Sequence, residues 1–151
     1  MKLLHRVPAL GRAMAAALAV ALPAAGAHGA DNPLDAERWK TRPVVVVVPQ
    51  EADPLLENVR STLRQTAARE AFREREMVLY TVVRGRGERN DKPLDTAETA
   101  ALLGALKLDP QGPAAFVLVG KDGGVKMRQD ASVDLQAVFD EIDRMPMRQT
   151  R

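Results

Sequence analysis

The stretch RPVVVVVP, residues 42–49, decides the fold. Its five consecutive valines, residues 44–48, are β-branched and favour a strand. The lack of polar alternation is typical of a central strand that is buried on both faces of a sheet. Asp53 and Pro54 follow after a short loop, and they fit the N-cap and first turn of a helix. A buried strand that leads into a helix predicts an α/β domain.

Apolar residues recur at helical spacing after Pro54, at Leu56, Val59, Leu63 and Ala67. This spacing predicts one long amphipathic helix that ends near residues 72–76. The segment MVLYTVV, residues 77–83, predicts the second strand because β-branched and aromatic residues dominate it. Residues 84–93 contain two glycines, a proline and many charges, and this composition indicates a surface loop.

The second half of the chain predicts a helix, two strands and a last helix. Asp95, with a glutamate three residues later, fits the capping box that starts a helix. Residues 114–119 and 125–128 predict strands, and the Asp-Gly between them favours a hairpin turn over a phosphate-binding loop, which would need a following helix. Ser132 is expected to cap the last helix, and Pro146 is expected to stop it.

The resulting order is β-α-β-α-β-β-α. A crossover helix between the first two strands makes them parallel, and the hairpin makes the last two antiparallel. We therefore expect an α/β fold with three α/β/α layers, in which helices cover both faces of a mixed four-stranded sheet, as in thioredoxin. The bond between Gly112 and Pro113 precedes the third strand, where that fold commonly carries a cis-proline, so cis and trans bonds are both considered there.

Residues 1–30 have the composition of a secretory signal peptide. Basic residues at its start precede an uncharged apolar run over residues 13–27, and Ala25-Gly26-Ala27 offers a cleavage site, with Ala30 as a second option. The alternative is a retained membrane anchor, but the run is shorter than the roughly 20 residues that span a bilayer. We expect a domain over residues 31–151 that is periplasmic or secreted and has no membrane span after cleavage.

The leader also accounts for the apparent basicity of the chain. It contains three of the 22 Lys and Arg residues and none of the 20 Asp and Glu residues, so the domain has a net charge of −1. This balance gives no reason to expect nucleic acid as a partner. Both histidines, His5 and His28, fall within residues 1–30, and the chain has no cysteine. Thiol chemistry, serine-histidine catalysis and zinc sites of histidine or cysteine are excluded for the domain, and no cofactor is expected.

Three segments, Leu34–Arg42, Gly120–Arg128 and Ile142–Arg148, resemble the DUDES-type domain. That domain occurs in extracellular animal proteins such as equarin and the sushi-repeat proteins and, alone behind a signal peptide, in bacteria. The similarity runs from about Pro33 to Arg148. It implies a peroxiredoxin-like variant of the thioredoxin fold without an established activity.

Active thioredoxin relatives carry their nucleophilic cysteine between the first strand and the next helix. Here that segment is Pro49–Pro54, which contains no cysteine and two acids. Disulfide exchange and peroxide reduction by cysteine are therefore ruled out. The leading hypothesis is a non-catalytic binding or adaptor domain for an unknown protein or cell-envelope partner.

That hypothesis places recognition near Trp39, the 49–54 loop and Gly112-Pro113, the edge where thioredoxin-like proteins meet substrates. Trp39, the only tryptophan, is either a lid over one end of the core or an exposed anchor for a partner. The candidate binding residues are Arg38, Trp39, Gln50, Glu51, Pro113, Lys121, Asp122 and Arg148.

Two further alternatives stay open. A thiol-independent enzyme or a copper(I)-handling protein would use carboxylates or the thioethers of Met145 and Met147, although Met145 also continues the apolar face of the last helix. The basic loop Arg84–Arg89 is either a solvated loop or a site for an acidic polymer or partner.

Overall fold

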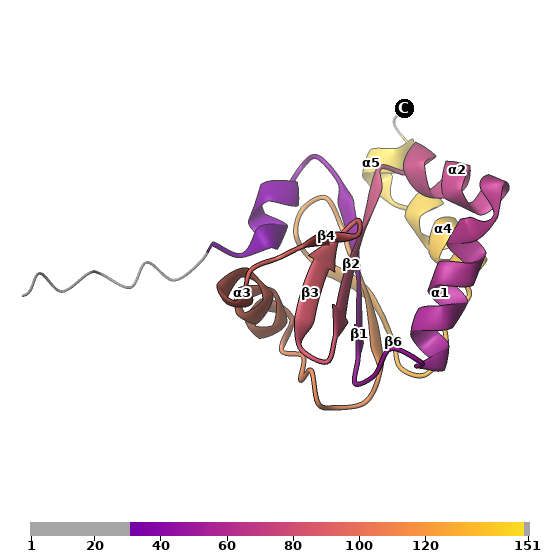
Figure 1. Cartoon of the computed structure of the whole chain (residues 1–151). Helices are drawn as coiled ribbons and strands as arrows, with labels where there is room; N and C mark the ends of the chain where they lie inside the picture. The colour runs from indigo at the N-terminus through magenta and orange to yellow at the C-terminus, as the bar shows by residue number, and fades with distance from the viewer. Residues whose placement is uncertain (1–30, 150–151) are drawn as a thin grey trace, which may run out of the picture.

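The computed structural model describes residues 31–149, and the expectations for the leader lie outside them. A six-stranded sheet with the order β4-β3-β2-β1-β5-β6 lies at the centre (Figure 1). Its strands are β1 (Arg42–Val48), β2 (Met77–Val83), β3 (Arg86–Arg89), β4 (Lys92–Pro93), β5 (Ala115–Val119) and β6 (Val125–Gln129). The helices are η1 (Pro33–Glu37), α1 (Pro54–Arg64), α2 (Thr66–Glu74), α3 (Thr96–Leu106), α4 (Leu135–Asp143) and α5 (Pro146–Gln149).

Strand β1 is the central strand that its valines predict, and all seven of its residues are buried. It runs parallel to β2, with Arg42 opposite Met77 and Val48 opposite Val83. It runs antiparallel to β5, which in turn pairs antiparallel with β6. The expected parallel and antiparallel pairs are therefore confirmed.

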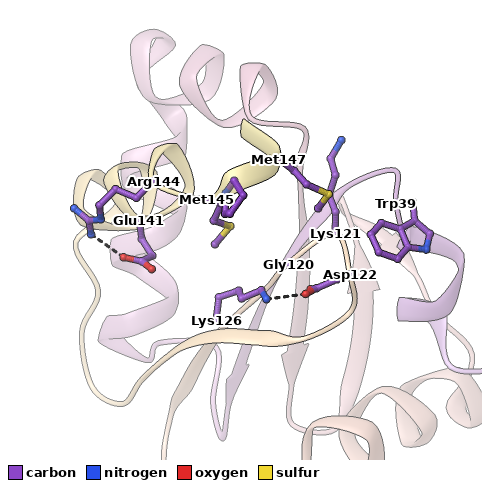
Figure 2. A pocket seen from close by; sticks show the side chains of 10 residues that line it. Trp39, Gly120, Lys121, Asp122, Lys126, Glu141, Arg144, Met145 and Met147 are labelled. Atoms are coloured by element: carbon purple, nitrogen blue, oxygen red, sulfur yellow. Dashed lines mark hydrogen bonds and ion pairs between the residues drawn. The ribbon is translucent and has the colours of Figure 1, made fainter. Parts of the chain in front are cut away.

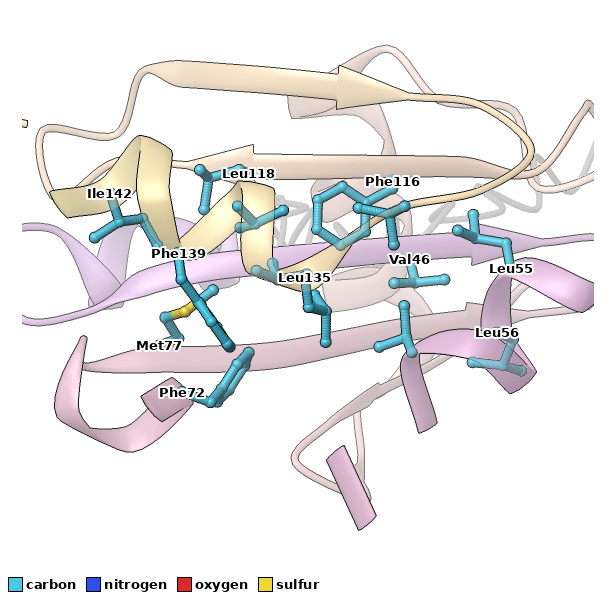
Figure 3. Packing of buried hydrophobic residues seen from close by; sticks show 14 of the residues in the cluster. Val46, Leu55, Leu56, Phe72, Met77, Phe116, Leu118, Leu135, Phe139 and Ile142 are labelled. Atoms are coloured by element: carbon cyan, nitrogen blue, oxygen red, sulfur yellow. The ribbon is translucent and has the colours of Figure 1, made fainter. Parts of the chain in front are cut away.

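The valines of β1 divide between two hydrophobic cores, because successive side chains of a strand point to opposite faces. Val44, Val46 and Val48 pack beneath α1, α2 and α4, whereas Val45 and Val47 pack beneath α3 and η1. The two groups of helices lie on opposite sides of the sheet in Figure 1. In the first core, Phe139 of α4 extends toward β2 and α2 (Figure 3). The three-layer arrangement follows from the burial of β1 on both faces.

The segment expected to be a surface loop, residues 84–93, contains two more strands, so the four-strand count is wrong. Arg84 and Gly85 both have positive φ angles (51° and 76°), as do Asn90 and Asp91 (46° and 63°). Two successive residues with positive φ are the requirement of the tight type I′ hairpin turn. β3 and β4 therefore extend the sheet beyond β2 as two hairpins.

The expected long helix is divided at Gln65. This residue has an extended conformation (φ −73°, ψ 131°) that ends α1 and begins α2. No proline or glycine lies near the break, so helical periodicity alone did not reveal it. Asp53 and the Asp95–Glu98 capping box cap their helices as predicted.

Two smaller expectations at helix ends also need correction, and the choice between a cis and a trans bond before Pro113 is decided. Asp134, not Ser132, caps α4, through a bond from the Gln136 backbone N–H to its side chain. Pro146 starts the short helix α5 after α4 has already ended. The Gly112–Pro113 bond is trans, because the residues that the structure describes contain no cis peptide bond. Among those residues, no helix is long and apolar enough to cross a membrane.

The break at Gln65 predicts the effect of a better cap. Gln65 occupies the N-cap of α2, but its side chain makes no capping hydrogen bond. Gln65→Asp should raise the free energy of unfolding in urea by about 1 kcal/mol, because aspartate accepts a bond from a free backbone N–H of the first turn. Gln65→Ala is the control and should give no gain. A loss of stability in the aspartate variant would instead indicate a continuous helix, whose interior disfavours aspartate.

Candidate functional site

One end of the sheet carries an open groove of about 530 Å³, which we call the Trp39 groove. The segment before β1 contributes Trp39, and the β5–β6 turn contributes Lys121 and Asp122, because β1 and β5 are antiparallel. Met145 and Met147 come from the α4–α5 region (Figure 2). The remaining lining residues are Gly120, Lys126, Glu141, Arg144 and Pro146.

Trp39 is an exposed side chain on an unusual backbone. It is 66% exposed, which contradicts a lid over the core. Its φ angle is +64°, a left-handed conformation that is uncommon for a bulky residue. Its backbone N–H donates to the Lys121 carbonyl oxygen at 2.7 Å. The fold therefore holds a large aromatic ring in solvent at the groove, in a conformation that costs free energy.

A buried carboxylate fixes the turn that carries Trp39. Glu37 is 4% exposed and accepts hydrogen bonds from Tyr80 Oη at 2.8 Å, Arg89 Nε at 2.6 Å and Thr41 Oγ1 at 2.6 Å. Burial works to raise the pKa of the Glu37 carboxyl, but the bonds from Arg89, Thr41 and Tyr80 outweigh it and lower the pKa. Burial and the Glu37 charge raise the pKa of Tyr80 above its usual range. The chain just before Trp39 is thus tied to β2 and β3.

A second buried ionic group lies at the same end of the sheet. Lys121 is 7% exposed, and its Nζ forms an ion pair with Glu76. Arg42 is 2% exposed, and its Nη1 lies 3.6 Å from Glu76 Oε2 and donates to the Arg75 carbonyl oxygen at 2.9 Å. Glu76 therefore joins the start of β1 to the end of β5. Lys121 lines the groove as a neutralised structural cation.

The other charges of the groove are also paired. Asp122 accepts from Lys126 Nζ at 2.8 Å, and Glu141 accepts from Arg144 at 2.7 Å (Figure 2). The bond from Lys126 lowers the pKa of Asp122. Within residues 31–149, no group of three or more His, Cys, Asp or Glu could hold a metal ion. The groove offers a ligand mainly the apolar surfaces of Trp39 and of the 145–147 segment.

The predicted binding residues do not form a single surface. Gln50 and Glu51 follow the end of β1, and Pro113 precedes the start of β5, so all three lie at the opposite end of the sheet from Trp39. The structure therefore separates the 49–54 loop and Gly112-Pro113 from Trp39.

Arg38 and Arg148 complete the predicted set. Arg38 packs against the β5–β6 turn, where a Cβ on Gly123 would lie 2.6 Å from Arg38 Nε and where φ is +84°. Any other residue there would have a strained backbone and would displace the Arg38 side chain. Arg148 belongs to α5, and its side chain lies outside the described part of the structure.

Sequence reasoning missed the residues that hold the groove in place. Glu37, Arg42 and Glu76 are buried or half-buried polar groups whose partners come from distant segments. No local motif marks them, because a tertiary contact creates each pair. Glu76 also has a positive φ angle of 54°, and no sequence pattern predicts it.

The Glu37 contacts predict a dependence of stability on pH. Because folding lowers the Glu37 pKa, its stabilisation is present above the ordinary value of 4.5 and is lost as pH falls through the lowered value. Glu37→Gln should lower the free energy of unfolding at neutral pH by roughly 2 kcal/mol and reduce its fall in acid. Urea titrations across this pH range measure both. Asp35→Asn, an exposed carboxylate in the same turn, is the control; parallel curves for Glu37→Gln and wild type would contradict the assignment.

The backbone of Trp39 predicts an unusual response to substitution. Trp39→Gly should keep the free energy of unfolding unchanged or raise it by up to about 1 kcal/mol, because glycine adopts positive φ without strain and an exposed ring contributes little burial. Trp39→Ala retains the strain and should be less stable than the glycine variant. A loss of more than about 2 kcal/mol in Trp39→Gly would mean that the ring covers the core.

Comparisons with known proteins give one match. Searches of curated proteins and of solved structures find no similar protein. The family described as Domain of unknown function (DUF4174) matches residues 33–151, which includes both the sheet and the Trp39 groove. The chain therefore belongs to the DUF4174 family of domains of unknown function.

Proposed function

We propose that this chain is an exported, non-catalytic binding or adaptor domain with a thioredoxin-like fold. In this proposal the Trp39 groove holds an apolar segment of a protein partner in the periplasm or outside the cell. The observation that carries the proposal is Trp39 itself, which is two-thirds exposed on a strained backbone beside a groove whose charges are already paired.

The strand order supports the thioredoxin-like part of the proposal. The four strands β2-β1-β5-β6 form one parallel and two antiparallel pairs, with a helical crossover between β1 and β2. The sequence predicts the parallel β1–β2 pair and the antiparallel β5–β6 pair, and the structure adds the β1–β5 pair and, beyond β2, the strands β3 and β4. The segment where thioredoxin relatives keep their cysteine, residues 49–54, carries none. A binding role fits a fold that lacks its usual nucleophile.

The composition of the Trp39 groove favours a protein partner. Tryptophan and methionine are enriched where proteins bind one another, because they bury a large, adaptable apolar surface. Burial of the exposed part of Trp39 supplies on the order of 3 kcal/mol. The groove charges need no partner, since Glu76, Asp122 and Glu141 neutralise its cations. An apolar side chain of the partner would therefore be the main contact.

Copper(I) handling is the second candidate, because Met145 and Met147 line the same groove. Thioether sulfur is a soft ligand that suits copper(I). However, Met145 also packs against the first hydrophobic core, as the helix face predicts. The two other methionines of residues 31–149, Met77 and Met127, are not among the groove residues. Two thioethers alone make a weaker case than the exposed Trp39.

Photo-cross-linking in intact cells tests the proposed partner site. A photoreactive amino acid at position 147 should form a recurrent covalent adduct with one envelope protein, and Trp39→Ala should reduce its yield about tenfold or more because it removes the main apolar contact. The same label at exposed Gln111, at the opposite end of the sheet, should not form this adduct. Denaturing gels and mass spectrometry identify the product.

Val125→Ala is the matched variant, since Val125 is also an exposed large apolar residue but does not line the groove. It should leave the adduct unchanged. Equal loss in both variants, or no adduct from position 147, would argue against the Trp39 groove as the site. Copper(I) binding tighter than about 1 µM that Met147→Leu abolishes would replace the proposal with the metal alternative.

A further inference from the structure

A second surface lies between helices α1 and α2 and the β2–β3 hairpin. Two hollows of about 350 and 450 Å³ lie there and share Arg60 in their walls. We call the pair the arginine groove. It is separate from the Trp39 groove, because the two have no lining residue in common.

Five arginines line the arginine groove, namely Arg60, Arg64 and Arg69 from the helices and Arg84 and Arg86 from the hairpin. Three carboxylates also line it, so its net charge is about +2, against −1 for residues 31–151 as a whole. The groove is thus a local concentration of positive charge on a nearly neutral domain.

The arginines differ in whether the protein already neutralises them. Arg60 forms an ion pair with Glu51. Arg64 forms one with Glu57 at 2.9 Å, and because both side chains are exposed, this ion pair contributes little to the stability of the fold. Among the described residues, the guanidinium groups of Arg69, Arg84 and Arg86 form no hydrogen bond or ion pair. These three cations remain available to an external anion, unlike the paired charges of the Trp39 groove.

The floor of the arginine groove is apolar. Leu63, Phe72, Leu79 and Val83 line it, and all but Phe72 are only half-buried. Leu79 and Val83 lie on the same face of β2, four residues apart, or about 13 Å along the strand. The hollows therefore follow β2 for a length that four or five extended residues would occupy.

We propose that the arginine groove binds an extended acidic peptide of a partner protein, in which carboxylate side chains alternate with apolar ones. The carboxylates would meet the unpaired arginines, whose planar guanidinium groups match carboxylate geometry in two-bond contacts. The apolar side chains would cover Leu79 and Val83. A sulfated polysaccharide could satisfy the arginines but has no large apolar side chain to bury on this floor.

The inference goes beyond the Trp39 groove and is tested separately, on the purified domain. The probe is a fluorescein-labelled peptide of about ten residues with alternating glutamate and leucine, measured by fluorescence anisotropy. We expect a Kd of about 100 µM or tighter at low salt, and weaker binding as salt screens the charges. A lysine-leucine peptide should not bind, and a glutamate-serine peptide should bind more weakly.

The double variant Arg84→Glu/Arg86→Glu should weaken binding of the glutamate-leucine peptide about tenfold or more. Arg69→Glu, on a different element, should also weaken it, which guards against a local effect on the hairpin. The matched control Lys40→Glu/Lys107→Glu makes the same change in net charge at exposed positions outside the groove and should bind like the wild type. Urea unfolding verifies that each variant is folded.

Three outcomes would overturn the proposal. The first is no binding of the glutamate-leucine peptide, and the second is equal loss in the groove and control variants. In the third, heparin binds in a manner that depends on Arg84 and Arg86 while the peptide does not bind, which would assign the groove to sulfated polysaccharide. None of these outcomes affects the cross-linking expected from position 147, so the proposals for the two grooves are tested independently.

Discussion

Burial of strand β1 on both faces is the constraint on which the rest of the structure depends. Five valines cannot be covered by helices on one side alone, so α1, α2 and α4 pack against one face and α3 and η1 against the other. With both faces covered and all seven of its residues buried, only the loops that flank the two ends of the strand reach the surface. The loops that meet at these ends come from different parts of the chain, and each end gathers its own set of side chains.

Along β1 the buried valines hold the helices against the sheet. At the start of the strand, buried polar and charged groups hold the neighbouring segments together. Taking Glu37 and Lys121 out of water is costly, and only pairing makes it tolerable. Each pair joins distant segments: Glu37 connects η1 to β2 and β3, and Glu76 connects Arg42 to Lys121. Such contacts hold their segments in one relative geometry, because breaking a pair would leave a buried charge without its partner. They explain how a turn can keep Trp39 exposed at positive φ.

Local signals predicted much of the fold, namely the central strand, the Asp-Gly hairpin and the capping box at Asp95. The missed elements depend on pairing within the fold: β3 and β4 have the composition of a loop, and they become strands because β3 pairs with β2 and β4 pairs with β3. The break at Gln65 has no local mark. The residues of the candidate site were also predicted only in part. Trp39, Met145 and Met147 do line one groove. Pro113 lies at the opposite end of the sheet because β5 runs antiparallel to β1, and this pairing cannot be predicted from the candidate residues alone.

The two grooves differ in how their charges are balanced, and this difference bears on the adaptor hypothesis. The protein neutralises the cations of the Trp39 groove itself and leaves apolar surface there, whereas Arg69, Arg84 and Arg86 have no ion-pair partner among the described residues. One segment with a single chemistry could not suit both. The arginine groove follows β2 from Leu79, opposite Val44, to Val83, opposite Val48, whereas the Trp39 groove lies beyond the start of β1 and shares no lining residue with it. A peptide in one groove therefore leaves the other open. A domain of this size that binds two segments of different chemistry at once would hold them at a fixed distance, which is a physical basis for an adaptor that needs no catalytic residue.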